Sequence, residues 1–126
     1  MTATDEITEL LASYEAALNT DDTALAVSCY TTDGVFMPTT LPTATGSELT
    51  AAYDQTFAAI HLDVCFTIDE LVVASDTLAY GLTRSNGTQT VHATGARTAE
   101  SNREVFIFVV ENGGWKISRY LFNKPA

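Results

Sequence analysis

The sequence predicts an α+β protein in which helices cover one face of a curved antiparallel sheet. Apolar residues recur at steps of three and four in two stretches of the first sixty residues, which is typical of amphipathic helices. From residue 61 onward the apolar period changes to two, which is typical of half-buried strands. Helices first and strands second predict segregated layers around one core.

The first helix is expected to begin at a Thr4 cap and to end near Asn19. Asp5 and Glu6 lie in its first turn, where carboxylates favour the positive end of the helix dipole. Tyr14 lies in the middle of the buried stripe and is expected to point inward. That stripe consists of Ile7, Leu10, Leu11, Tyr14 and Leu18.

A second, shorter helix is expected after Asp21 or Asp22, either of which can cap it. It runs through Leu25, Cys29 and Tyr30. Asp33-Gly34 then breaks the helix before a strand over residues 35–37.

The third helix is expected to follow a loop over the pocket mouth, residues 39–45. Ser47 caps it and Glu48 occupies its first turn. Its single apolar stripe directs Tyr53 inward. The stripe consists of Leu49, Ala52, Tyr53, Phe57 and Ile60.

The following strands are assigned from alternation and turn signals. Asn86-Gly87 predicts a two-residue hairpin, and residues 94–102 are expected to form a loop. In this register Arg84 shares the inward face with Tyr80, and His92 lies on the other face. The residues expected inward on these strands are Leu62, Val64, Phe66, Ile68, Leu78, Tyr80, Leu82 and Arg84.

The last two strands are predicted to be apolar on both faces, because residues 105–110 are apolar at every position. Asn112-Gly113 turns the final hairpin and pairs Phe106 with Arg119. Glu104 is then the diagonal neighbour of Arg119, within reach of an ion pair. A slip of one residue would bring Arg103 to the pocket in place of Arg119.

Composition limits the classes of function. The length of 126 residues predicts a single domain over 1–126. The apolar share is 46%, but no stretch approaches the roughly 18 consecutive apolar residues that a membrane-spanning helix needs. A net charge of −10 repels nucleic acids and anionic membranes. The acidic N-terminus lacks a secretory signal, which predicts a cytoplasmic protein. Cys29 and Cys65 are expected to be buried free thiols.

The chain resembles the nuclear transport factor 2-like superfamily, and within it the SnoaL-like and ketosteroid-isomerase-like proteins. Residues 14–22 resemble the family's first-helix signature, residues 30–38 its helix-to-strand junction, and residues 113–117 its last hairpin. The resemblance implies a cone-shaped barrel, with three N-terminal helices packed on the concave face of a curved antiparallel sheet around an apolar cavity. The two-sided apolar pattern of the last strands predicts a homodimer that packs through the outer sheet face.

Ketosteroid isomerases supply a mechanism for comparison. In them a first-helix tyrosine donates a hydrogen bond to the developing enolate, a carboxylate after the first strand moves the proton, and a protonated acid completes the oxyanion hole. Tyr14 matches the tyrosine. Met37 or Pro38 falls at the position of the base, and neither accepts a proton. The usual mechanism therefore lacks its base. Glu104 is the ionisable residue nearest to the position of the acid.

The candidate catalytic residues are therefore Tyr14, Arg84 and Glu104. The tyrosine has a structural alternative in a core hydrogen bond, the arginine in an exposed rim position, and the glutamate in an ion pair with Arg119. His61 and His92 are isolated and are expected at the surface or at a dimer interface, so no metal or cofactor is expected. The candidate ligand-binding residues are Tyr53, Met37, Phe57, Tyr80 and Arg119.

Two functions remain open from the sequence. The first is cofactor-free isomerisation, cyclisation or hydration of a small hydrophobic ligand, polyketide-like or steroid-like, whose carbonyl or phenol is polarised by tyrosine and arginine. The second is a non-catalytic ligand-binding or dimeric assembly module of the same fold. The missing base supports the second function, and the inward tyrosines support the first.

Overall fold

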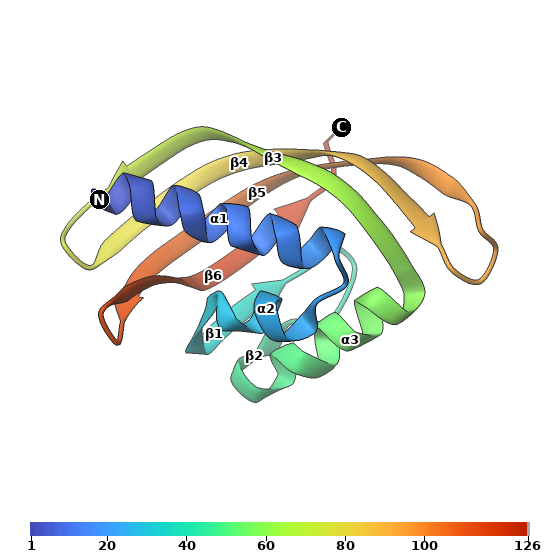
Figure 1. Ribbon diagram of the computed structural model, residues 1–126, viewed down its shortest axis with the longest axis horizontal. Coiled ribbons are helices and arrows are strands. Elements are labelled where there is room, and N and C mark those ends of the chain that lie inside the picture. The colour runs from blue at the N-terminus through green and yellow to red at the C-terminus, as the bar shows by residue number, and fades with distance from the viewer. Residues whose placement is uncertain (126) are drawn as a thin grey trace.

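One six-stranded sheet and three helices make up the protein in the computed structural model, which describes residues 1–125. The sheet has the order β2-β1-β6-β5-β4-β3 and stays open between its two edges. It arches over the helices, which lie together under its concave face (Figure 1). The predicted α+β cone is confirmed. The elements are α1 (Ala3–Asn19), α2 (Thr23–Ser28), β1 (Tyr30–Met37), β2 (Ala44–Thr45), η1 (Gly46–Glu48), α3 (Leu49–Ala59), β3 (Ile60–Val73), β4 (Leu78–Val91), β5 (Arg97–Glu111) and β6 (Gly114–Asn123).

The helices begin where side chains satisfy free backbone amides. Thr2, and not the expected Thr4, caps α1 through a reciprocal capping box with Asp5. Asp22 accepts the backbone amide of Leu25 and caps α2, as one of the two predicted alternatives. A capping box between Thr45 and Glu48 starts the turn η1 ahead of α3, so the expected Ser47 cap is wrong. In each capping box an acidic side chain three residues on reaches back to the cap.

The strand β1 begins earlier than expected, at Tyr30, and its pairing with β6 is parallel. Its register shifts between Tyr30 and Val35, so the Asp33-Gly34 pair interrupts a strand instead of ending a helix. The predicted extension of the second helix to Tyr30 is therefore wrong.

The strand β4 runs without a break through Asn86-Gly87, so the predicted hairpin at this pair is wrong. The chain turns at residues 92–96, where the β4–β5 turn extends beyond the helices at one end of the molecule (Figure 1). The predicted loop over residues 94–102 is also wrong, because β5 already begins at Arg97.

Over residues 78–85 the two faces of β4 are the reverse of the prediction. Ala79, Thr83 and Ser85 are buried on the concave face, whereas Tyr80 and Arg84 are exposed on the convex face. The choice failed because large apolar residues occupy the outer face and small residues face the aromatic core. Gly81 shows the reason, since a side chain there would meet the ring of Phe108.

The final hairpin turns at residues 112–113, and its first pairs, Val110 with Trp115 and Phe108 with Ile117, are confirmed. A bulge then shifts the register, so Phe106 pairs with Tyr120 and not with Arg119. Ile107 pairs with Arg119, which places this arginine on the outer face.

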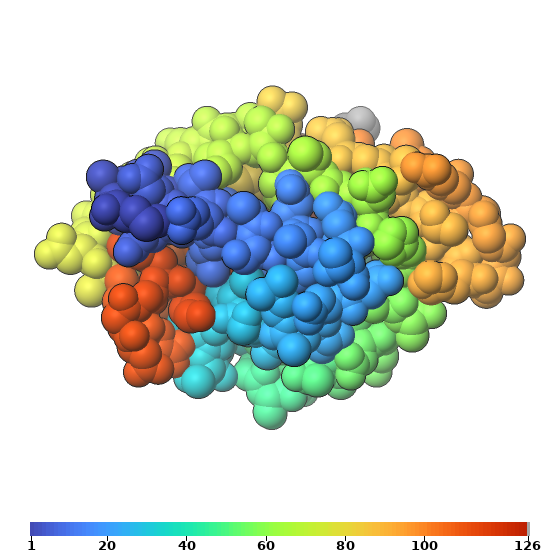
Figure 2. Space-filling model, viewed as in Figure 1, coloured from blue at the N-terminus to red at the C-terminus, as the bar shows by residue number. Residues whose placement is uncertain are grey.

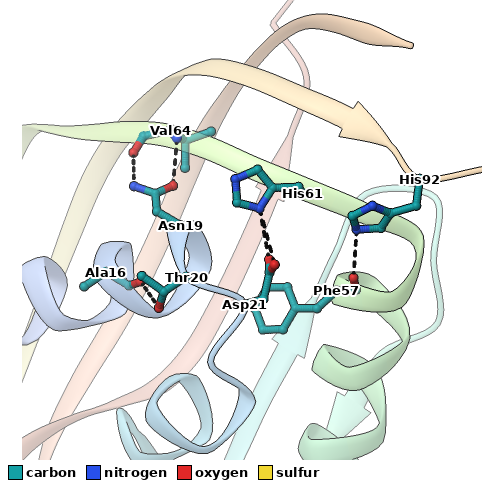
Figure 3. Close-up of polar contacts among 8 residues, drawn as sticks. All are labelled: Ala16, Asn19, Thr20, Asp21, Phe57, His61, Val64 and His92. Atoms are coloured by element: carbon teal, nitrogen blue, oxygen red, sulfur yellow. Dashed lines mark hydrogen bonds and ion pairs between the residues drawn. The ribbon is translucent and has the colours of Figure 1, made fainter. Parts of the chain in front are cut away.

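The edge strand β3 is covered by α1 (Figure 3). The Asn19 side chain donates to the carbonyl of Val64 and accepts its amide, both at 2.8 Å. Glu15 accepts the amide of Phe66 at 2.7 Å. These side chains occupy edge groups that would otherwise be open to pairing with another strand, which explains why the first-helix signature holds polar residues beside its apolar stripe.

The histidines join helix ends to strands in the same region (Figure 3). The His61 Nδ1 atom lies 3.3 Å from the Asp21 carboxylate. The His92 Nε2 atom lies 3.2 Å from the carbonyl oxygen of Phe57, to which it donates in the matching tautomer. Both side chains therefore have local structural contacts within the chain.

The outer sheet face is apolar, as predicted from residues 105–110. Leu82, Val105 and Leu121 form one cross-strand row, and Tyr80 pairs with Ile107 in the next. All five side chains are exposed. On the face seen in Figure 2, α1 and α2 cover the centre of the molecule. None of the helices in residues 1–125 is long and apolar enough to cross a membrane.

Candidate functional site

A cavity of about 210 Å³ lies inside the cone, between the helices and the concave face of the sheet. Tyr14 from α1, Tyr53 from α3 and Tyr120 from β6 contribute to its wall. Ser85 and Asn102 contribute polar groups from β4 and β5. Most of the other lining residues are apolar, so the few polar groups are well suited to orient a small organic ligand.

A chain of three tyrosine hydroxyls lies at the helical side of the cavity. The Tyr53 hydroxyl contacts both the Tyr14 hydroxyl and, at 2.7 Å, the Tyr30 hydroxyl. Tyr14 and Tyr53 line the cavity, whereas Tyr30 lies behind them. Three hydroxyl protons serve two hydrogen bonds, so one proton is left over, and the orientation in which Tyr30 donates to Tyr53 and Tyr53 to Tyr14 leaves that of Tyr14 for a ligand.

Burial keeps these tyrosines neutral. All three side chains are buried, and burial raises the pKa of Tyr14, Tyr30 and Tyr53 well above the ordinary value of 10.0. At neutral pH they are hydrogen-bond donors and not bases. The predicted inward orientation of Tyr14 and Tyr53 is confirmed, and Tyr30 is an addition that the periodicity did not single out.

Tyr120 adds a fourth buried tyrosine to the site. Its ring stacks on the rings of Phe106 and Phe36, with centroid distances of 4.2 Å and 5.5 Å. Burial raises its pKa well above 10.0, and the charges of nearby acidic groups, Glu104 among them, raise it further. Sequence reasoning missed Tyr120 because the bulge beside Arg119 was not visible in the alternation of the last strand.

Glu104 forms a buried polar cluster on β4 and β5. The Thr83 hydroxyl donates to Glu104 Oε1 and the Ser85 hydroxyl donates to Glu104 Oε2, both at 2.6 Å. Asn102 Nδ2 donates to Ser85 Oγ at 3.2 Å. The cluster connects the cavity wall at Ser85 and Asn102 to a carboxyl group behind it. The sequence could not reveal the cluster, because Thr83 and Ser85 were assigned outward and Asn102 to a loop.

Burial is the main cause that raises the pKa of Glu104 above 4.5, while hydrogen bonds from Ser85 and Thr83 and the charge of Lys124 oppose the shift. Between the unfolded and folded pKa values the folded state retains a proton that the unfolded state has lost. The free energy of unfolding therefore falls with rising pH in this window, by up to about 1.4 kcal/mol per pH unit.

Glu104→Gln is expected to remove this loss, so its stability relative to the wild type increases as the pH rises above about 4.5. Urea unfolding of both proteins from about pH 4 to about pH 8 measures the difference. A constant difference across this range would contradict the raised pKa of Glu104.

The predicted arginines do not reach the cavity. Arg84 Nε lies 3.1 Å from Asp69 in an exposed ion pair. Arg119 is exposed, and its Nη1 donates to the Ser118 carbonyl at 2.8 Å, so the expected ion pair with Glu104 is wrong. Arg103, the alternative, is exposed and donates to Asn123. All three arginines lie on the outer face of the sheet. Arg84 lies there because the inner and outer faces of β4 are exchanged relative to the prediction, and Arg119 because of the bulge in β6.

Two predicted ligand contacts are wrong in position, and a third lies behind the wall. Tyr80 is 40% exposed and Met37 is 44% exposed, both away from the cavity. Phe57 is buried against Tyr53 but is absent from the lining of the cavity. Pro38, one of the two residues that the resemblance places at the position of the base, lines the cavity and has no proton-accepting group.

The mouth of the cavity continues into a second hollow, an apolar groove of about 440 Å³ along α3. Phe36, Pro38 and Leu41 line both spaces. An ion pair between Lys124 and Glu100 lies at the cavity wall. No group of three or more potential metal ligands occurs within residues 1–125.

The curved sheet, the covering helices and the cavity between them define a protein of the nuclear transport factor 2-like class. A family model for the SnoaL-like domain matches residues 1–120, and the chain belongs to this family. The family fold is consistent with a ligand-binding or isomerase-like role. The predicted family is thereby confirmed.

Solved structures agree with this assignment. A ketosteroid isomerase-like protein from Erwinia carotovora atroseptica SCRI1043 is 31% identical, with 97% of this chain and 95% of that chain covered and a TM-score of 0.91. A nuclear transport factor 2-like superfamily protein from Salmonella enterica serovar Typhimurium LT2 is 19% identical, with coverage of 97% and 90% and a TM-score of 0.84. A conserved protein from Planctomyces limnophilus is 22% identical, with coverage of 94% for both chains and a TM-score of 0.82. The last two show the fold alone. A search of the curated proteins finds no match.

Proposed function

We propose that the chain binds a small, largely hydrophobic molecule with a carbonyl or phenol oxygen and converts it without a cofactor, by isomerisation, cyclisation or hydration. The observation that carries the proposal is the pair of neutral hydroxyls, Tyr14 and Tyr53, in the wall of a mostly apolar cavity. Donors placed where negative charge develops on oxygen stabilise enolate-like transition states, and apolar surroundings strengthen this effect. The name of the Erwinia relative points to the same chemistry.

The roles of the remaining residues follow from their positions. Tyr14 and Tyr53 take over the polarising role that Arg84 was expected to share. Glu104 is the buried carboxyl group best placed to exchange a proton with the cavity, because Ser85 both lines the cavity and donates to Glu104. Pro38 argues against steroid isomerisation through the usual carboxylate base.

Acetophenone tests this function, because it is a small aryl ketone with enolisable methyl protons. Calorimetric titration is expected to show saturable binding at one site per chain, about tenfold tighter than that of ethylbenzene, which lacks the oxygen. Exchange of the methyl protons with deuterated water, followed by nuclear magnetic resonance, then measures enolisation. Equal affinity for both compounds, or no binding of either, would overturn the proposal.

The second candidate function is a non-catalytic ligand-binding or dimeric assembly module. Pro38 in place of a base supports the non-catalytic reading, and binding of acetophenone without accelerated exchange would favour it. The exposed rows of Leu82, Val105 and Leu121 and of Tyr80 and Ile107 support a homodimer, in which a second copy covers the outer sheet face.

Sedimentation of the wild type and of Leu82→Lys tests the homodimer. The wild type is expected to sediment as a dimer at micromolar concentration. The variant is expected to sediment as a folded monomer, because a second copy could cover the apolar row only by burying the unpaired charge of the lysine. A monomeric wild type would argue against the assembly.

A further inference from the structure

We propose that the ligand of this cavity carries two polar groups, a carbonyl oxygen for the tyrosine chain and a hydroxyl or N–H donor for Asn102. This inference rests on the proposed function and narrows its substrate class to hydroxylated aryl or cyclic ketones and their amino analogues. Asn102, a residue of the cavity wall, has a side-chain oxygen, Oδ1, that lacks a hydrogen-bond donor. This atom is buried and has no hydrogen-bond partner within residues 1–125.

The orientation of the Asn102 amide follows from its neighbours. While Glu104 is ionised it can only accept, so the single proton of Ser85 is committed to Glu104 Oε2 at 2.6 Å. Ser85 Oγ must therefore accept from Asn102, which requires Nδ2 on that side. Oδ1 is left as the free group, and a flipped amide would place two acceptors against each other.

The Glu104 cluster also fixes the Asn102 side chain in place. Thr83 and Ser85 are both buried on β4, and their hydroxyls hold the two oxygens of Glu104 on β5. Asn102 lies two residues from Glu104 on the same concave face of β5, and it lines the cavity. The cluster therefore fixes the orientation of the Asn102 amide before a ligand arrives.

An unpaired buried acceptor is unfavourable unless a ligand supplies the missing donor. A ligand with a donor at this position regains a hydrogen bond, and a ligand without one leaves the oxygen desolvated. Sites of this kind discriminate strongly between compounds that differ in one hydroxyl. Since the tyrosine chain offers one free donor, the hydroxyl of Tyr14, the two ends of the ligand require opposite hydrogen-bonding character.

Three ketones of similar size test the inference by calorimetric titration. They are acetophenone, para-hydroxyacetophenone and para-methoxyacetophenone, which share the carbonyl and differ in the donor at the opposite end. The wild type is expected to bind the hydroxy compound about tenfold more tightly than the methoxy compound. In Asn102→Leu this ratio is expected to fall to about one, whereas Asn123→Leu, at an exposed position outside the cavity, should keep it.

Asn102→Ala provides a second variant, because it also removes the acceptor oxygen without placing a larger apolar side chain beside Ser85, and it is expected to lose the preference for the hydroxy compound. A preference that Asn102→Leu leaves unchanged would overturn the inference. If Asn102→Leu does not fold, retention of the preference in Asn102→Ala would overturn the inference instead, and its loss would support it. Carbonyl binding that depends on Tyr14 without any preference for the hydroxyl would overturn this inference alone. Failure of all three ketones to bind would overturn the proposed function together with it.

Discussion

Gly87→Ala is expected to destabilise the fold by about 3 kcal/mol or more, since backbone atoms occupy the place of its side chain. A Cβ atom at Gly87 would lie 1.9 Å from the carbonyl oxygen of Asp63 and 2.8 Å from the Cα atom of Val64. Both atoms belong to β3, which pairs with β4 at this point. Relief of the overlap would require the two strands to separate, with loss of their hydrogen bonds.

Gly114→Ala is the matched control, because nothing lies within 4 Å of a Cβ atom at that position. It is expected to change the free energy of unfolding by about 0.5 kcal/mol or less. Urea unfolding followed by circular dichroism compares both variants with the wild type. Equal stability of the two variants would show that β3 and β4 can separate at Gly87 without cost.

Gly87 also shows how far local sequence signals determine this fold. The Asn86-Gly87 pair carries the same short hairpin signal as Asn112-Gly113, yet it lies inside β4. Here the glycine permits close approach of two strands, which is the other reason for a glycine within a strand. The choice between these reasons depends on β3, far away in the sequence, so the pair alone could not decide it.

The helices were more predictable than the strands, because the helical stripe identifies the buried face by itself. The inward positions of Tyr14 and Tyr53 followed from spacing alone and are confirmed. On β4 both faces carry apolar residues, so alternation could not tell the inner face from the outer. Alternation therefore predicts Arg84 inward and misses Ser85, and the loop predicted for residues 94–102 hides Asn102.

The last strand adds a second kind of limit. A bulge in β6 changes the face of every following residue, and the local sequence gives no signal for it. It moves Arg119 outward and brings Tyr120 to the cavity. The resemblance to a known family indicated the cavity. The polar lining of the cavity depends on which face of β4 points inward and on the bulge in β6, and only the pairing of the strands defines both.

Tyr14→Phe is expected to weaken acetophenone binding about tenfold and to slow the exchange of its methyl protons about a hundredfold or more. The variant keeps the ring and its contacts with Phe106 and Tyr120 but removes the hydroxyl at the cavity. The effect on exchange is larger because the carbonyl oxygen gains negative charge in the transition state, where a donor contributes more than in the ground state.

Two matched variants separate this role from general effects of tyrosine replacement. Tyr80→Phe changes an exposed residue of the outer face and should leave both quantities unchanged. Tyr30→Phe removes the far end of the hydroxyl chain, so Tyr53 loses its partner at 2.7 Å while Tyr14 still reaches the ligand. It should cost about 1 kcal/mol in unfolding free energy, and ligand affinity should change by less than about threefold. Equal losses of affinity in Tyr14→Phe and Tyr30→Phe would show that the hydroxyls act only as a structural unit, and that Tyr14 donates nothing of its own to the ligand.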